Sequence, residues 1–273
     1  MQTILVPLDF SPASNNALIY AANLAKEINA GLFLFHAYIL PTPISEMPYL
    51  MIPTDDVHQA NEKLLKQKAD QIISDFNIEI RWEARMGMPS DEIKFIIIEQ
   101  KIELVVMGMR GSGVVDKIIG STTINVINKV KTPVLILPSD TVYRRLSSIV
   151  YASDFSYKTN FHLFDPLLQL ANKYNATISV LHIELTNTEE PVTQLMGKKE
   201  LAAIFARHEH RFIYLKEKSV TAGINLYIQK NDTNLLVVVA HKHDFFERFF
   251  TVNHTKAMAY KTRVPMLVLQ DKE

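Results

Sequence analysis

The stretch ILVPLDFS at residues 4–11 decides the fold, because the chain repeats its pattern as IVYASDFS at residues 149–156. Each stretch is an apolar run, typical of a buried strand, that ends in Asp-Phe-Ser. Two further pairs of segments match in the same order: LAKEINAGLFLFH (24–36) with LANKYNATISVLH (170–182), and TPVLIL (132–137) with VPMLVL (264–269). Three matched blocks in one order indicate an internal duplication, so we expect two copies of one domain.

Short apolar runs alternate with helical patterns in both copies. We expect strands at residues 3–8, 32–38, 79–84, 104–107 and 134–137, and again at 148–153, 177–182, 211–215, 235–239 and 266–269. We expect helices at residues 14–28, 56–76, 90–101 and 122–130, and again at 161–173, 198–207, 220–229 and 255–260. Ser11 and Ser90 are expected to mark the starts of the first and third helices. Nearly all-apolar strands separated by helices predict doubly wound α/β domains, each with a parallel sheet covered on both faces.

Length and composition fit this organisation. The 273 residues suffice for two domains, which we place at 1–140 and 147–273, with a polar linker between the copies. Lys plus Arg and Asp plus Glu number 29 each, so no basic field favours a nucleic acid or a membrane as partner. The lack of cysteine excludes disulfides, thiolate catalysis and Cys-ligated metals. The chain shows no leader-like start and no run of roughly 20 apolar residues, so we expect a cytoplasmic protein.

The segment MGMRGSGVVDKIIGSTT, residues 107–123, contains four of the eight glycines of the chain. It follows the fourth expected strand and leads into the fourth expected helix. Glycine permits close backbone approach to an anion, and a helix N-terminus such as the one expected at Ser121 and Thr122 favours phosphate. The segment has neither a Walker A ending nor the Rossmann spacing. It indicates a phosphate-binding loop, with the alternative that these glycines serve only turns and a helix start.

The motif residues resemble those of the universal stress proteins. The nucleotide-binding pattern of that family is an Asp after the first strand and, after the fourth, Gly, two residues, Gly, nine residues, Gly, then Ser or Thr; the matching positions are Asp9, Gly108, Gly111, Gly120 and Ser121. The resemblance covers nearly the whole chain twice, as in tandem members. It implies two parallel five-stranded sheets of strand order 3-2-1-4-5, of the adenine-nucleotide alpha-hydrolase-like fold, packed with pseudo-two-fold symmetry near their fifth strands.

The resemblance also implies a site for ATP or another adenine nucleotide in the first copy, often with Mg²⁺. Asp9 and the backbone near Ala37 would contact adenine. The ribose and phosphates would be contacted by Gly108, Gly111, Gly120, Ser121 and Thr122. Arg110 and Lys117 are candidates to neutralise phosphate, against the alternative of ordinary solvated loop charges.

Two departures from the family pattern bear on this site. Only eight residues separate Gly111 from Gly120, which shortens the loop that would hold a triphosphate. In the second copy the positions of the three motif glycines and the following serine hold Ala240, His243, Val252 and Asn253. Side chains there would project where phosphate needs bare backbone, so we expect no nucleotide in the second copy although it keeps Asp154.

Other groups of residues carry weaker signals. The spacing of His241, His243 and His254, together with Lys242, disfavours a metal site. Four phenylalanines at positions 245, 246, 249 and 250 exceed what one buried face accepts, so we expect part of this cluster at an interface. His36 and His182 close the second strand of each copy and are expected to be framework residues with satisfied hydrogen bonds. The proline-rich segment 40–54 is expected to be a mobile loop beside the site.

No nucleophile with a base, no catalytic carboxylate pair and no metal-ligand set is recognisable, so we do not expect a dedicated enzyme. The leading hypothesis is a cytoplasmic stress-response protein that binds an adenine nucleotide in its first copy and uses occupancy to bias conformation or partner choice. Two alternatives stay open. One is a nucleotide-free interaction protein of the same fold, with a protein partner or a second copy of the chain, and the other is a weak ATPase.

Overall fold

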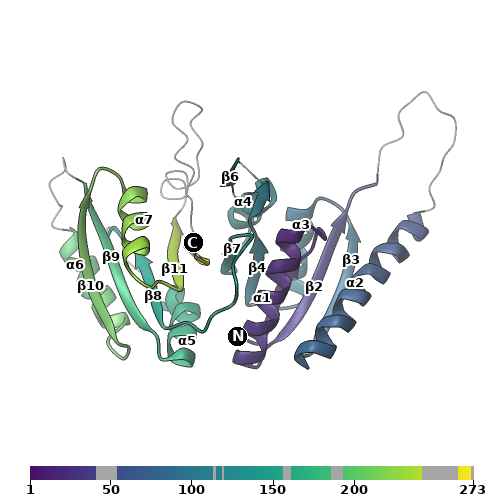
Figure 1. The fold of residues 1–273 in the computed structure, drawn as a ribbon, viewed down its shortest axis with the longest axis horizontal. Helices are drawn as coiled ribbons and strands as arrows, with labels where there is room; N and C mark the ends of the chain where they lie inside the picture. Colours follow the sequence, from purple (N-terminus) through teal and green to yellow (C-terminus); the bar gives the residue numbers. More distant parts are fainter. Residues whose placement is uncertain are drawn as a thin grey trace. The chain divides into compact units, whose positions relative to one another are not determined.

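The computed structural model describes residues 1–40, 54–112, 115–118, 120–155, 161–185, 193–241 and 264–271 (Figure 1). The chain divides into two compact units, the first of Met1–Gly108 and Gly120–Thr132 and the second of Met109–Ile119 and Pro133–Glu273. The domain bounds predicted from the sequence, 1–140 and 147–273, follow the duplication instead, and they stay a prediction.

The first unit is a parallel sheet covered by helices. Its elements are β1 (Thr3–Pro7), α1 (Pro12–Ile28), β2 (Gly31–Tyr38), α2 (Thr54–Phe76), β3 (Ile80–Met86), α3 (Pro89–Glu99), β4 (Leu104–Gly108) and α4 (Ser121–Lys129). β1 lies between β2 and β4, and β3 pairs with β2, so the order is β3-β2-β1-β4. α1 packs with α2, and α3 packs with α4. Right-handed crossovers place these two pairs on opposite faces of the sheet.

The second unit repeats this arrangement. Its elements are β5 (Arg110–Ser112), β6 (Val115–Ile118), β7 (Val134–Leu137), β8 (Ser148–Ala152), a 3₁₀ turn (Phe161–Phe164), α5 (Asp165–Tyr174), β9 (Thr177–Leu185), α6 (Thr193–Ile204), β10 (His210–Glu217), α7 (Val220–Lys230), β11 (Leu235–His241) and β12 (Met266–Asp271). Its main strands follow the order β10-β9-β8-β11-β12-β7, and β5 pairs with β6 as a separate antiparallel hairpin.

The predicted α/β class, parallel pairing and strand order are confirmed for β3-β2-β1-β4 and for β10-β9-β8-β11-β12. The prediction of two separate, all-parallel five-stranded sheets is wrong in one respect. β7, the fifth strand of the first repeat, pairs antiparallel with β12, the fifth strand of the second, with Ile136 opposite Met266 and Val134 opposite Val268. All of β7 is buried, and an unpaired edge there would leave backbone N–H and C=O groups without partners. The two fifth strands therefore lie together, as the resemblance implied.

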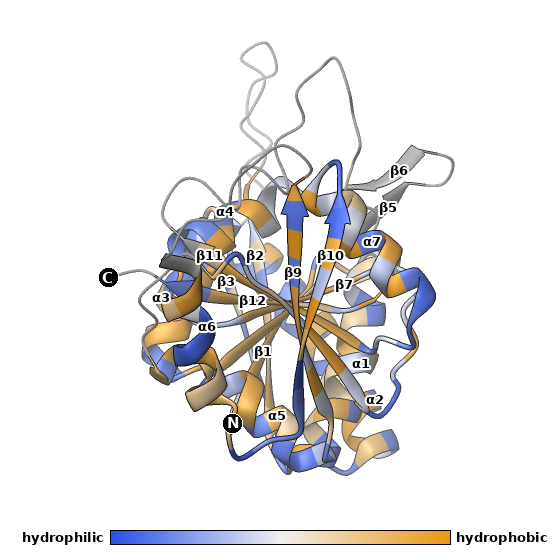
Figure 2. Ribbon diagram, turned by 90° about the vertical axis from the view of Figure 1, so that its left-hand side faces the viewer, coloured by the Kyte–Doolittle hydropathy of each residue, from blue (hydrophilic) through white to orange (hydrophobic). Residues whose placement is uncertain are grey.

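Most strands are apolar along most of their length, whereas β10 ends in hydrophilic residues (Figure 2). The consecutive residues Ile4, Leu5 and Val6 of β1 are all fully buried, and so are the neighbours Ile149 and Val150 of β8. Consecutive burial, rather than alternation, arises because helices cover both faces of a parallel sheet. The core of each unit therefore lies between its sheet and its helices.

The predicted helix starts had different outcomes. Ser11 is confirmed as the N-cap of α1, because its Oγ accepts a hydrogen bond from the N–H of Ser14 at 3.2 Å. The prediction for Ser90 is wrong, since α3 begins one residue earlier, at Pro89. Proline suits the first helical position because its missing N–H would have no partner there. Most other predicted elements are present with shifts of one to three residues at their ends. The helix predicted at 198–207 lies at 193–204 as α6, and the first four residues of the helix predicted at 161–173 form a 3₁₀ turn. The helix predicted at 255–260 lies outside the described residues.

Candidate functional site

Asp9 lies in the turn that connects β1 to α1. Its Oδ1 accepts hydrogen bonds from Ser11, at 3.1 Å from the backbone N and 2.5 Å from Oγ. Phe10, between them, has a φ of 59°, in the left-handed region that residues other than glycine seldom adopt. Ser11 also caps α1, so one tight turn ends the strand and starts the helix. The same turn holds the exposed Asp9 carboxylate at the carboxyl end of β1.

His36 of β2 anchors this turn from the neighbouring strand. Its Nδ1 lies 2.6 Å from the carbonyl oxygen of Leu8. A carbonyl only accepts, so Nδ1 carries the hydrogen and donates it. The His36 ring also lies 4.8 Å, centroid to centroid, from the ring of Phe10. The prediction that His36 is a framework residue is confirmed.

Ala37, the next residue, presents backbone groups beyond the end of β1. The carbonyl of Phe35 faces β1, since it accepts from the N–H of Leu8 at 2.7 Å. Backbone groups in a strand alternate sides with a period of two, so the N–H and C=O of Ala37 face the same way. β1 pairs with β2 only as far as Pro7 opposite Phe35. The backbone edge of Ala37 therefore extends beyond the last paired residue of β1, on the side of the turn that holds Asp9.

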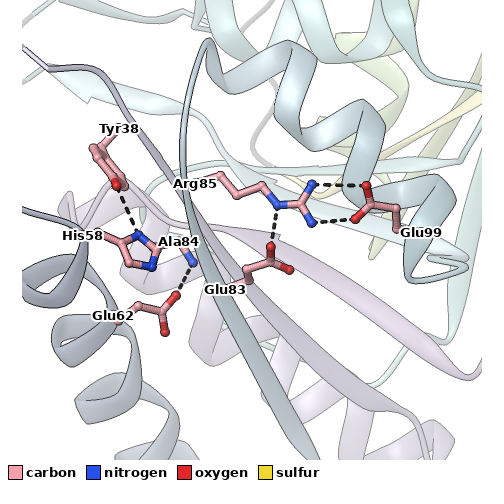
Figure 3. Close-up of polar contacts among 7 residues, drawn as sticks. All are labelled: Tyr38, His58, Glu62, Glu83, Ala84, Arg85 and Glu99. Carbon is pink, nitrogen blue, oxygen red and sulfur yellow. Dashed lines mark hydrogen bonds and ion pairs between the residues drawn. The ribbon is translucent and has the colours of Figure 1, made fainter. Parts of the chain in front are cut away.

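A short series of rings continues from this edge. Tyr38 lies 6.3 Å from His36, and its hydroxyl lies 3.1 Å from Nδ1 of His58 on α2 (Figure 3). Close by, the Glu62 carboxylate accepts from the N–H of Ala84 on β3 at 2.6 Å (Figure 3). The sequence analysis missed these contacts. The aromatic spacing of His36 and Tyr38, two apart on one strand face, was the available signal.

Gly108 ends β4 on the other side of β1. A Cβ built there would lie 2.4 Å from the carbonyl oxygen of Ala13 and 2.7 Å from its carbonyl carbon. Real Cβ atoms do not approach backbone this closely, so Gly108 is required by the packing of α1 on β4. This reason for Gly108 is neither a turn nor a helix start, so it differs from both predictions for the glycine segment, and the phosphate-binding role stays a prediction.

The carboxyl ends of β1 and β4 meet at a topological switch point. From β1 the chain passes through α1 to β2 on one side, while β4 pairs with β1 on the other. In open α/β sheets, ligands bind in the crevice outside the strand ends at such a point. Asp9 and Gly108 are the residues that border it.

The rest of the glycine segment forms more regular structure than predicted. Arg110 and Gly111 lie in β5, which pairs with β6, where Lys117 lies; their side chains are outside the described part of the structure. The sequence carried a signal for this hairpin, because two residues beginning with glycine separate the two strands.

Gly120 is the N-cap of α4, followed by exposed Ser121 and Thr122. The predicted helix start is confirmed, but Gly120 has φ −64° and ψ 151°, which any residue can adopt. A positive φ is therefore no reason for glycine at this position.

Comparison with known proteins places these features in a family. The sequence profile of the universal stress protein family matches the chain twice, at residues 1–138 and 146–270. The chain belongs to this family. Among its relatives, universal stress protein MJ0531 of Methanocaldococcus jannaschii is 27% identical over 142 residues, which cover 49% of this chain and 80% of that protein.

Solved universal stress protein structures share the fold. One from Archaeoglobus fulgidus DSM 4304 is 18% identical, with a TM-score of 0.76, and the match covers 99% of this chain and 98% of that chain. PA1789 of Pseudomonas aeruginosa PAO1, a protein of unknown function, is 14% identical, with a TM-score of 0.60 over 99% of this chain and 92% of that chain. At these identities the likeness shows the tandem fold alone.

The second universal stress protein repeat has the same Asp-Phe-Ser turn, and helix α6 packs against it. Phe155 has a φ of 57° and stacks at 4.8 Å on His182, whose Nδ1 lies 2.9 Å from the carbonyl oxygen of Ser153. His182 is thus also a confirmed framework residue. On α6, a Cβ at Gly197 would lie only 2.1 Å from the carbonyl oxygen of Phe155. The helix therefore packs directly on this turn.

An aromatic and cationic group lies beside the same turn. Lys198 Nζ lies 5.3 Å from the ring centre of Phe212 and 4.9 Å from that of Tyr214. Tyr214 pairs with His182 in the sheet, as Ala84 pairs with His36 in the first repeat. A large ring thus replaces a methyl group at the equivalent position of the second repeat.

Several predicted features lie outside the described residues: the loop at 41–53, the four phenylalanines, His243, His254, Val252 and Asn253. Ala240 is buried in β11. Within the described ranges, no cluster of three or more His, Cys, Asp or Glu side chains could hold a metal ion. No helix in those ranges has the length and apolar character needed to cross a bilayer.

Proposed function

We propose that the first repeat binds one adenine nucleotide, ATP or another, and that the chain acts in the cytoplasmic stress response by a binding or regulatory role rather than by turnover. The observation that carries this proposal is the placement of the Asp9 carboxylate and the Ala37 backbone edge at the switch point beside β4. Membership of the universal stress protein family supports it.

The base end of the proposed site fits adenine. A carboxylate accepts from an amino group, and a backbone N–H and C=O together complement the donor and acceptor on the edge of the base. Asp9 is fixed by two hydrogen bonds from Ser11, so little further ordering is needed on binding. The Phe10 ring, held against His36, adds an aromatic surface close to the same edge.

The phosphate end depends on the start of α4. Gly120, Ser121 and Thr122 offer first-turn N–H groups and two hydroxyls, and a helix N-terminus favours negative charge. Arg110 and Gly111 precede it on β5 and are proposed as phosphate contacts. When bound, Mg²⁺ would neutralise phosphate charge, with the Ser121 and Thr122 hydroxyls as the oxygen donors nearest the helix start.

A nucleotide-free interaction protein is the second candidate. Gly108 favours it, because packing against Ala13 accounts for this glycine without any ligand. The loop between Gly111 and Gly120, one residue shorter than the family pattern, points the same way.

Titration calorimetry with ATP and AMP, each with and without Mg²⁺, tests the proposal. We expect one site per chain, and loss of binding in Gly120→Val, which places a branched side chain at the start of α4. Asp9→Asn and Asp154→Asn are a matched pair, because both acids follow the first strand of a repeat. We expect only Asp9→Asn to weaken binding, since an amide in place of the carboxylate loses charge and one acceptor.

Two outcomes would contradict the proposal. Two equivalent sites per chain, or full affinity in Gly120→Val, would show that the phosphate position is misassigned. No binding of either nucleotide would favour the interaction protein.

A further inference from the structure

Strand β10 lies at one end of its sheet and pairs with a strand on one side only. It runs parallel to β9 along its eight residues, which span about 26 Å, and no described strand lies beyond it (Figure 1). The carbonyl of Glu209 accepts from the N–H of Ile178 on β9 at 2.9 Å. Backbone groups alternate sides along a strand, so those of the odd-numbered residues face β9. The N–H and C=O groups of Phe212, Tyr214 and Lys216 therefore point away from the sheet, and we call them the β10 edge.

The equivalent strand of the first repeat, β3, is protected against pairing with a further strand. The carbonyl of Glu79 accepts from the N–H of Leu32 on β2 at 2.9 Å, so the N–H of Ala84 points outward by the same alternation. The Glu62 carboxylate of α2 accepts from that N–H at 2.6 Å (Figure 3). Tyr214 is the equivalent residue in the second repeat, and no described residue forms a hydrogen bond with its outward N–H. Since α6 does not pack along β10 as closely as α2 packs along β3, the second repeat leaves open the edge that the first repeat closes.

The side chains of β10 also favour a partner strand. Phe212, Ile213 and Tyr214 are residue types enriched in strands, and Leu215 extends the apolar run. Tyr214 is 41% exposed although it lies in the middle of the strand. Proteins usually protect an edge strand with proline, a bulge or an inward-pointing charge, but β10 contains no proline and pairs with β9 without a shift in register. An edge of this length and composition is a template for strand pairing.

We propose that β10 pairs antiparallel with β10 of a second copy of this chain, about a two-fold axis at Tyr214. Residues that lie opposite each other in an antiparallel pair share a face of the sheet. In this register Arg211 lies opposite Glu217 of the partner subunit, and Ile213 lies opposite Leu215 of the partner subunit. The axis repeats both contacts, because residue i meets j and j meets i. One strand thus supplies a cation, an anion and apolar residues in a self-complementary order.

Charge favours this register over its two neighbours. With the axis at Ile213, Glu217 would lie opposite Glu209 of the partner subunit, and like charges directly opposite each other are destabilising. With the axis at Leu215, Glu217 would lie opposite Ile213 of the partner subunit, without a cation. Of the three registers, only the proposed one gives this carboxylate an opposite charge.

The cations of β10 fit this arrangement. Arg211 donates from Nε to Ser179 at 3.0 Å, which leaves both Nη groups for Glu217 of the partner subunit. Lys216 forms an ion pair with Glu184 of its own chain at 3.7 Å, so its charge is partly balanced within the subunit.

Pairing of two copies satisfies the β10 edge and then stops. The outward groups of Phe212, Tyr214 and Lys216 would form about six N–H···O bonds with the partner subunit. Because Glu62 occupies the outward N–H of β3, that strand offers no second edge, and a two-fold contact gives a closed dimer. Each new bond replaces one to water, so we expect a weak dimer with a dissociation constant on the order of 10 µM.

Sedimentation velocity of the full chain without nucleotide, over a range of concentrations, tests the dimer. We expect Lys216→Pro to stay monomeric where the unsubstituted chain is dimeric, because proline lacks the outward N–H and its ring occupies the place of the partner strand. The bonds from β10 to β9 are retained, since this N–H does not face β9. Lys216→Ala is the matched control, because it removes the same side chain but keeps the N–H, and it should dimerise. Thermal melting checks that both variants fold.

Hydrogen exchange gives a second measurement, on the unsubstituted chain. The N–H groups of Ile213 and Leu215 face β9 and should exchange slowly at every concentration. Those of Phe212, Tyr214 and Lys216 should exchange fast in dilute solution and slowly at concentrations that give the dimer. This alternation would identify β10 as the interface.

Cysteine cross-linking tests the register, since the chain has no cysteine of its own. Tyr214→Cys places two thiols directly opposite each other, at a Cα separation of about 5.5 Å that a disulfide accepts. We expect it to form the oxidised dimer faster than Ile213→Cys, whose thiols meet only with the axis at Ile213. Glu217→Arg should weaken the dimer several-fold, because arginine would lie opposite Arg211 of the partner subunit.

Three results would each overturn the proposal: a monomer at all concentrations, a dimer that persists in Lys216→Pro, or faster cross-linking through Ile213→Cys. A monomer would leave the β10 edge to an extended segment of another protein. Because no nucleotide is present, failure here is distinct from failure of the proposed nucleotide site.

Discussion

Replacing Gly108 by alanine should destabilise the first unit without any ligand present. The added Cβ would lie 2.4 Å and 2.7 Å from the carbonyl oxygen and carbon of Ala13, and both are backbone atoms. Relief requires α1 to move away from β4. That movement is resisted because Ala17, Ala21 and Ala25 of α1 are fully buried in the core. Overpacking of this kind costs about 1–3 kcal/mol.

The assay uses Trp82, the only tryptophan of the chain, which lies on β3 in the same unit. Its fluorescence in urea reports the unfolding of this unit separately from the other, which matters because two-unit proteins need not unfold in one step. A loss of about 1–3 kcal/mol would appear as a lower urea midpoint with an unchanged slope.

Gly120→Ala is the matched control. Gly120 has an extended conformation that alanine adopts freely, and loss of a glycine N-cap costs about 0.5 kcal/mol. Equal stability of Gly108→Ala and the unsubstituted protein, or a larger loss in Gly120→Ala, would refute the assignment of Gly108 to helix packing.

Three further outcomes follow from the described contacts. Gly197→Ala should lower the stability of the second unit by about 1–3 kcal/mol, measured by circular dichroism in urea, because the new Cβ would lie 2.1 Å from the Phe155 carbonyl oxygen. Arg85→Met should reduce the loss of folding stability that occurs at acid pH, because the hydrogen bond from Arg85 lowers the pKa of Glu99 in the folded protein. The stability that this bond contributes is present above the ordinary Glu pKa of 4.5 and is lost as the pH falls through the lower pKa of the folded state. His36→Phe should cost about 1–3 kcal/mol by leaving a main-chain carbonyl without its donor, and nitrogen NMR should show the hydrogen on Nδ1 in the unsubstituted protein.

The duplicated fold could be predicted from the sequence because its signals are local. Buried strands are continuous apolar runs, and the Asp-Phe-Ser turn marks the end of the first strand in each copy. The antiparallel pairing of β7 with β12 could not be predicted in the same way, since four apolar residues do not specify which strand they pair with or in which direction. The reason for Gly108 was equally hidden, because it depends on an atom of Ala13 that is distant in sequence.

The Asp-Phe-Ser turn itself says less about ligands than its position suggests. Both copies have the left-handed phenylalanine, the same 4.8 Å ring contact with a histidine, and the same bond from that histidine to the carbonyl preceding Asp. Such a framework is maintained in the second repeat, where the glycines of the motif are absent from the sequence. The turn therefore has a structural role in both repeats, in which it ends the first strand and starts the following helix.

The two repeats differ in the side chains that lie beside the Asp-Phe-Ser turn. In the first, Ala84 is small and its N–H is bonded by Glu62, whereas in the second Tyr214 occupies the equivalent position under Lys198. Tyr214 is 41% exposed, and its ring lies 6.0 Å from that of Phe155, so it adds an aromatic side chain beside the turn of the second repeat. The two repeats therefore differ in side chains of the third strand and second helix as well as in the glycines after the fourth strand.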